Sequence, residues 1–228
     1  MIPDLEKLDN LLIELKMFNA TLVAVSKTKP KEAIEQIYNH GHFDFGENYV
    51  QELVSKQQLL PEDIRWHFIG HLQSNKIKQI SPFVHLIHGV DSPQLLSSLN
   101  SQAEKSHLNL EVLLQVDIAS ESTKFGFSVE EARRHMEQIM KNPYERVKIR
   151  GFMGMATFTE DQNVIKKEFQ TLKLLYDEIK RNSDNETANQ FNILSMGMTS
   201  DYKIALSEGS TMVRIGSAIF GERDYTAR

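Results

Sequence analysis

Short apolar runs alternate with amphipathic stretches along the whole chain. The runs are rich in β-branched and aromatic residues, and they predict strands at Leu22–Ser26, His42–Phe45, Trp66–Ile69, Val84–Val90, Leu110–Asp117, Ile149–Met153, Phe191–Ser195 and Met212–Ile215. Apolar residues at helical spacing predict helices at Lys31–Asn39, Tyr49–Leu59, Asn75–Ile80, Gln94–Glu104, Glu130–Met140, Val164–Arg181 and Tyr202–Glu208. Leucines from Leu5 to Leu15 predict one more helix before the first strand.

This alternation predicts an α/β fold, because parallel strands need crossover connections and helices usually supply them. About eight strands favour a single (β/α)8 TIM barrel with an extra N-terminal helix. An open doubly wound sheet is the alternative, since periodicity alone does not separate the two. The polar segment Arg181–Gln190 reads as a surface loop rather than a linker, so we expect one domain over residues 1–228.

Composition and charge narrow the classes of function. The 228 residues are 40% hydrophobic and 25% charged, as in ordinary globular proteins. The net charge of −5 disfavours nucleic-acid binding, which needs a basic surface. The acidic N-terminus is unlike a signal peptide and no apolar run could span a bilayer, so we expect a cytoplasmic protein without membrane contact. With no cysteine, disulfides and thiolate chemistry are excluded.

Polar and small residues gather where the predicted strands end, which is where barrels of this type place their active sites. Lys27 follows the first strand and is either a reactive amine or a solvated strand cap. Gly216 and Ser217 follow the last strand, and the loop Ser195–Thr199 follows the seventh. Barrels often bind phosphate after these two strands, although Gly216 could equally serve only to turn the chain. Arg214 shares a strand face with Gly216, and the sequence leaves open whether that face points into the barrel.

Seven sequence blocks together resemble the pyridoxal-phosphate homeostasis protein family, a family of small proteins with the barrel of alanine racemases. The blocks are AVSKTKP (24–30), FGENYVQE (45–52), WHFIGHLQSNK (66–76), VDIASESTKFGF (116–127), GFMGMATF (151–158), LSMGMTSDY (194–202) and GSTMVRIGSAIFGER (209–223). They cover nearly the whole chain, and their combination is highly specific.

The resemblance implies pyridoxal 5'-phosphate (PLP) as cofactor and assigns roles to seven residues. Lys27 looks like the lysine that forms a Schiff base with the PLP aldehyde. Four residues look like the phosphate-binding set: Ser195, Thr199, Gly216 and Ser217. Arg214 looks like the residue facing the pyridine nitrogen, and Asn48 is similar to the amide near the ring. The family more often has serine where Thr199 stands, but threonine keeps the hydroxyl. No catalytic or metal-ligating residue is assigned.

The resemblance favours a protein that carries or buffers PLP without turnover over a PLP-dependent enzyme such as an amino-acid racemase. An arginine facing the ring nitrogen cannot keep that nitrogen protonated, so the cofactor is a poorer electron sink. A two-base racemase takes its second acid/base from an additional β-rich domain, and this sequence ends at Arg228, soon after the last predicted strand. We expect a monomer that delivers PLP to apo-enzymes. A barrel hydrolase using Glu47 and Asp91 is the third hypothesis, although neither carboxylate has a clear partner in the sequence.

Several other residues are set aside. His67 and His71 have a spacing reminiscent of zinc sites but lack the glutamate of a metalloprotease motif, so structural roles are favoured. His85 and His88 should point in opposite directions from one strand. Lys29 is expected to be solvated, and Lys124 lies in a loop that could fold over the site.

Overall fold

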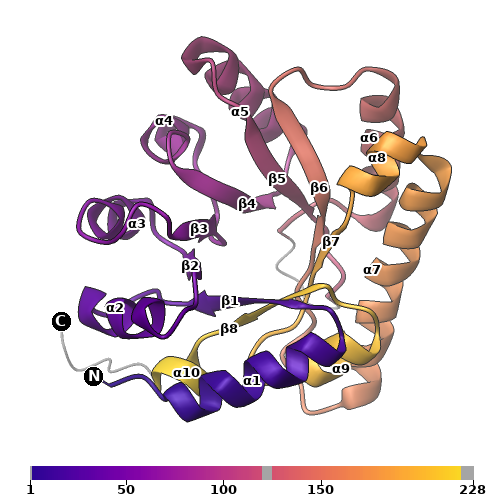
Figure 1. Cartoon of the computed structure of the whole chain (residues 1–228). Coiled ribbons are helices and arrows are strands. Elements are labelled where there is room, and N and C mark those ends of the chain that lie inside the picture. The colour runs from indigo at the N-terminus through magenta and orange to yellow at the C-terminus, as the bar shows by residue number, and fades with distance from the viewer. Residues whose placement is uncertain (1, 120–124, 222–228) are drawn as a thin grey trace.

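Eight parallel strands close into a barrel in the computed structural model, which describes residues 2–119 and 125–221 (Figure 1). The strands are β1 (Thr21–Val25), β2 (Asp44–Glu47), β3 (Arg65–Phe68), β4 (Val84–Val90), β5 (Leu110–Gln115), β6 (Val147–Met153), β7 (Ile193–Ser195) and β8 (Met212–Ile215). Each strand pairs with the next, and β1 pairs with β8. The predicted TIM barrel is thus confirmed and the open sheet is wrong.

Helices surround the barrel and bury its outer face (Figure 1). They are α1 (Leu5–Met17), α2 (Lys31–Asn39), α3 (Val50–Gln57), η1 (Ser74–Lys76), α4 (Ile77–Ile80), α5 (Pro93–Ser106), α6 (Val129–Lys141), α7 (Gln162–Asn182), α8 (Asn185–Gln190), α9 (Tyr202–Ser207) and α10 (Ser217–Phe220). No described helix combines the length and the apolar character needed to cross a bilayer.

The predicted extra helix α1 lies beside the short helix α10 (Figure 1). Asp4 caps α1 by accepting a hydrogen bond from the backbone of Lys7 at 2.8 Å, and its own N–H donates to the carbonyl of Ile219. The apolar side of α1 buries Leu8, Leu11 and Leu15. Because α10 has only four residues, α1 supplies apolar cover near the closure between β8 and β1.

The core has two parts because successive side chains of a strand point to opposite faces. The larger part lies between the strands and the helices. A smaller cluster, centred on Val23, Leu86, Leu113, Met153 and Met212, fills the barrel interior. Polar side chains share that interior, and they connect it to the site described below.

Several element bounds differ by about two residues from the sequence-based prediction, and two differences bear on the fold and the site. The end of the predicted surface loop Arg181–Gln190 forms helix α8, which begins because Asp184 caps the N–H of Thr187 at 2.7 Å. The second strand begins and ends two residues later than predicted, at Glu47 rather than Phe45. Its last residue is a buried glutamate, which a search for apolar runs does not include.

Candidate functional site

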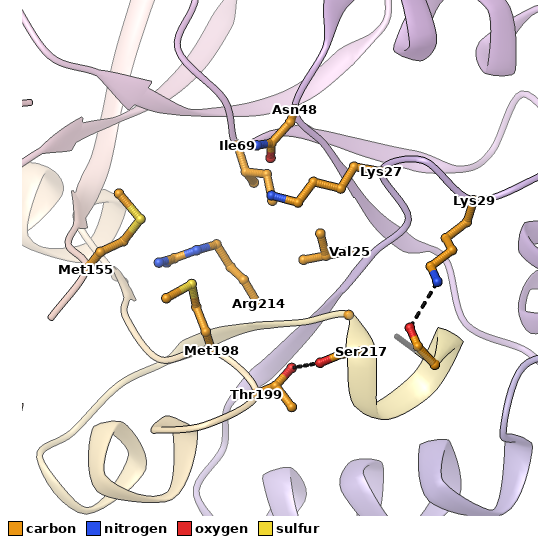
Figure 2. Close-up of a pocket in the computed structure, with 12 residues that line it drawn as sticks. Val25, Lys27, Lys29, Asn48, Ile69, Met155, Met198, Thr199, Arg214 and Ser217 are labelled. Atoms are coloured by element: carbon orange, nitrogen blue, oxygen red, sulfur yellow. Dashed lines mark hydrogen bonds between the residues drawn. The ribbon is translucent and has the colours of Figure 1, made fainter. Parts of the chain in front are cut away.

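A cavity of about 550 Å³ opens at the carboxyl ends of the strands. Six of the seven residues assigned by resemblance line it: Lys27, Asn48, Thr199, Arg214, Gly216 and Ser217. Arg214 lies in β8, and the other five follow the ends of β1, β2, β7 and β8, which the closed barrel brings to one mouth. Apolar walls are supplied by Val25, Ile69, Met155 and Met198 (Figure 2).

Lys27 is half-buried in a tight turn just after β1, and its side chain reaches across the cavity toward Asn48 (Figure 2). The next residue, Thr28, has a positive φ of 64°, which is uncommon for a residue other than glycine. Its N–H donates to Glu52 Oε1 at 2.6 Å, and the N–H of Lys29 donates to the carbonyl of Ser26 at 3.0 Å. These bonds fix the backbone that carries the Lys27 amine.

A buried ion pair lies beneath this turn. Lys56 donates from Nζ to Glu47 Oε1 at 2.7 Å and to Glu52 Oε1 at 2.6 Å, and also to the carbonyl of Ser26 at 2.8 Å. Burial raises the pKa of Glu47 to about 7, against the opposing charge of Lys56. Glu47 and Lys56 therefore connect β2 and α3 to the residue that precedes Lys27.

Arg214 points into the barrel and lies across the cavity from Lys27, which answers the question the sequence left open (Figure 2). Its Nη1 donates to the carbonyl of Ser195 at 2.9 Å and to the hydroxyl of Ser195 at 2.7 Å, and its Nη2 donates to the carbonyl of Gly154 at 3.1 Å. Burial lowers the pKa of Arg214 to about 10, although the nearby charge of Asp201 opposes this shift. The guanidinium therefore remains a cation at neutral pH.

Two hydroxyls meet at the side of the cavity formed after β7 and β8. Ser217 Oγ donates to Thr199 Oγ1 at 3.2 Å (Figure 2). Asp201 holds the loop that carries Thr199, because its Oδ1 accepts from the N–H of Met198 at 2.6 Å. Two adjacent hydroxyls can donate hydrogen bonds to an anionic group such as a phosphate.

Ser195 does not lie with the other residues of the predicted phosphate-binding set. It is fully buried beneath Arg214, where its hydroxyl also meets His88 Nδ1 at 3.2 Å. The prediction that Lys29 is solvated is wrong. Lys29 is buried and donates to the carbonyls of Phe220 and Gly221 at 3.2 and 2.9 Å. Lys124 lies outside the described residues.

The carboxylates of the hydrolase hypothesis both have partners that the sequence did not reveal. Glu47 pairs with Lys56, and Asp91 Oδ2 lies 2.8 Å from His71 Nδ1. The prediction that His85 and His88 face opposite ways is wrong, because both rings pack against His67, at centroid distances of 5.3 and 5.2 Å. The register of β4 against β3 shifts between Val84 and Leu86, which breaks the alternation of side chains at His85.

Sequence reasoning missed Lys56, Glu52 and Asp201. Glu52 and Lys56 are four residues apart on a predicted helix, which is the spacing of a helical ion pair and was available as a signal. Their joint contact with Glu47 and Ser26 depends on how α3 packs against the barrel, and the sequence does not encode that locally.

The fold and the site together define a class: parallel (β/α)8 barrels that place a lysine amine, an inward arginine and a hydroxyl pair around one mouth. Residues 5–224 match the family described as alanine racemase, N-terminal domain. Two proteins named pyridoxal phosphate homeostasis protein are similar over most of their length. The one from Aquifex aeolicus is 37% identical, with 90% of this chain and 88% of that protein covered. The one from Homo sapiens is 39% identical, with 94% and 81% covered.

Solved structures agree with these matches. PipY of Synechococcus elongatus, in a structure with PLP bound, is 32% identical with a TM-score of 0.81, covering 95% of this chain and 99% of that one. Alanine racemase of Corynebacterium glutamicum is 14% identical with a TM-score of 0.74, covering 100% of this chain and 64% of that one, which shows a shared fold alone. The chain belongs to the alanine racemase N-terminal domain family, among the pyridoxal phosphate homeostasis proteins. The family resemblance seen in the sequence is confirmed.

Proposed function

We propose that this protein binds PLP in the cavity and carries or buffers it, without turnover of a substrate. The observation that carries the proposal is the convergence of an amine, a cation and two hydroxyls on one cavity of about 550 Å³. Relatives named for PLP homeostasis, and a neighbouring structure with PLP bound, support the same ligand.

Each polar group suits one part of PLP. The cofactor supplies an aldehyde that reacts with a neutral primary amine. Lys27 would provide that amine, and its condensation with the aldehyde, which releases water, would hold the ligand covalently. Thr199 and Ser217 would receive the phosphate, with Gly216 between them and β8. Arg214 would face the ring nitrogen, and Asn48 would lie beside the ring.

The residues around the cavity support a carrier over a racemase. The charged guanidinium of Arg214 can donate a hydrogen bond to the ring nitrogen, but it would not keep that nitrogen protonated. The cavity lining within the described part of the chain contains lysines and an arginine but no histidine, tyrosine or carboxylate as a second acid/base. The amine of Lys29 is engaged by two carbonyls. We therefore expect the bound PLP to pass to PLP-dependent apo-enzymes.

Absorption spectroscopy with peptide mapping tests the proposal. The purified protein mixed with PLP should show the absorbance of a lysine-bound cofactor, and borohydride reduction should fix the cofactor on the peptide containing Lys27. Lys27→Ala should lose both signals, whereas Lys31→Ala, a surface control on α2, should keep them.

Function is measured with the same samples. The loaded protein should restore activity to an apo-enzyme and should racemise alanine no faster than free PLP does. Labelling of another lysine in the wild-type protein would refute the assignment of Lys27. Racemisation well above the free-cofactor rate would favour the enzyme.

A further inference from the structure

A chain of buried side chains crosses the barrel interior from the proposed PLP cavity to the opposite mouth. Below Arg214, the Ser195 hydroxyl lies 3.2 Å from His88 Nδ1. His88 Nε2 lies 3.0 Å from His67 Nδ1, and His67 Nε2 lies 3.0 Å from Asp44 Oδ1. All five side chains are buried, and they come from β8, β7, β4, β3 and β2.

The two ends of this hydrogen-bonded chain determine in which direction its hydrogen bonds are donated. Arg214 can only donate hydrogen bonds, and an ionised carboxylate such as Asp44 can only accept them. Burial alone would raise the pKa of Asp44, but hydrogen bonds from Arg65 and His67 outweigh it and hold that pKa well below its ordinary value. Arg65 contacts both oxygens of Asp44, at 2.8 and 2.5 Å. Asp44 therefore ends the hydrogen-bonded chain as an acceptor.

When both histidine rings are neutral, the groups between these ends are left with one arrangement of protons. Because Asp44 accepts, His67 carries its proton on Nε2, and its Nδ1 accepts from His88 Nε2. His88 Nδ1 then accepts from the hydroxyl of Ser195, whose oxygen accepts from Arg214. Burial lowers the pKa of His88 well below its ordinary value, and the charge of Arg214 acts in the same direction, so a neutral ring fits.

We propose that Asp44, His67 and His88 are positioning residues that act through Ser195 to hold the guanidinium of Arg214 in place for PLP. The chain keeps the Ser195 hydroxyl proton turned away from Arg214, so that the oxygen always accepts from Nη1. This inference rests on the proposed function for its ligand, but the proton arrangement itself does not. It links the PLP cavity to a second cavity of about 480 Å³ at the other mouth, lined in part by Arg65 and His85.

A metal site would be a different use of the same residues. Ligand-type atoms of Asp44, His67 and His85 all lie within 4.8 Å of one another. However, both oxygens of Asp44 already accept from the guanidinium of Arg65, and His67 uses both ring nitrogens in the chain. A cation would have to displace these bonds, so the hydrogen-bonded chain accounts for the geometry better.

Nitrogen NMR of protein labelled in histidine tests the proton arrangement without PLP. In the wild-type protein, His67 and His88 should each carry one proton, on Nε2. In Asp44→Asn the fixed direction is lost, because an amide can donate as well as accept. The rings should then show mixed or reversed tautomers. His85→Ala is the matched control: His85 stacks edge-on against His67 at 5.3 Å in the same mouth but is not a link in the chain, so the tautomers should not change.

PLP binding tests the coupling. Loss of one hydrogen-bond restraint should speed PLP release from Asp44→Asn by about three- to tenfold. The absorbance of the bound cofactor should shift, while His85→Ala stays within about twofold of the wild type. A proton on Nδ1 of either ring in the wild-type protein, or a doubly protonated ring, would overturn the inference whether or not the variants fold.

The two proposals fail in different ways. Equal PLP release and spectra in Asp44→Asn and His85→Ala would overturn the positioning role while leaving PLP binding intact. Wild-type protein that has the expected tautomers but takes up no PLP would refute the proposed function, and with it the ligand of this inference, while the proton arrangement would stand.

Discussion

Lys56→Met should leave the buried carboxylate of Glu47 without its cation. The side chain of Lys56 is 8% exposed and that of Glu47 is 0% exposed, so water cannot replace the lost partner. Removing one member of a buried pair costs about 3–5 kcal/mol of unfolding free energy. For a chain of this size, even 3 kcal/mol corresponds to a drop in Tm of about 6–12 °C.

The loss of unfolding free energy in Lys56→Met should grow as pH rises. Burial raises the pKa of Glu47 to about 7, above its ordinary value of 4.5. The stabilisation from that shift is fully present below pH 4.5 and is lost as pH rises through about 7. Without Lys56 the pKa of Glu47 should rise further, so the variant should lose more stability between pH 6 and pH 8.5 than the wild type does.

Urea unfolding followed by the fluorescence of Trp66, the single and buried tryptophan, measures both effects. Lys31→Met is the matched control, because Lys31 and Glu35 form an exposed helical pair, 3.9 Å apart, with the four-residue spacing that Lys56 has with Glu52. It should cost less than about 1 kcal/mol. Adding Glu47→Gln to Lys56→Met should remove the pH dependence. The reasoning fails if Lys56→Met is no less stable than Lys31→Met at pH 8.5, or if its loss is the same at both pH values.

Two further predictions concern the contact between β6 and β7 and the barrel mouth opposite the proposed PLP cavity. Gly151→Ala should unfold the protein or cost more than about 3 kcal/mol in urea, because a Cβ there would lie 1.7 Å from the carbonyl oxygen of Ile193 and the residue has a φ of +149°. Gly41→Ala, where nothing lies within 4 Å, should be much milder, and equal costs would contradict the clash. Asp44 has a pKa below its ordinary value of 3.8, so its stabilisation is present above that pH and is lost as pH falls further. Between pH 5 and pH 3 the free energy of unfolding should therefore fall more steeply for the wild type than for Asp44→Asn. Parallel curves would refute this.

Much of the site could be predicted because it follows the ends of strands. Lys27 comes just after β1 and Gly216 just after β8, and any closed parallel barrel brings such positions to one mouth. The roles given to Asn48 and Thr199 came from resemblance to a family, since nothing in their local pattern distinguishes them from loop residues. The structure places both at the cavity.

The sequence by itself determined the alternation of strands and helices, and with it the α/β class, and the lysine at the first strand end. These follow from local periodicity, which records which face of each element is apolar. Only the tertiary structure decided that Ser195 turns down beneath Arg214, that Lys29 is buried and that Lys56 reaches Glu47. These contacts depend on strand register and on helix packing. They join residues that no local pattern relates, and a buried polar group keeps its place only when such a distant partner satisfies it.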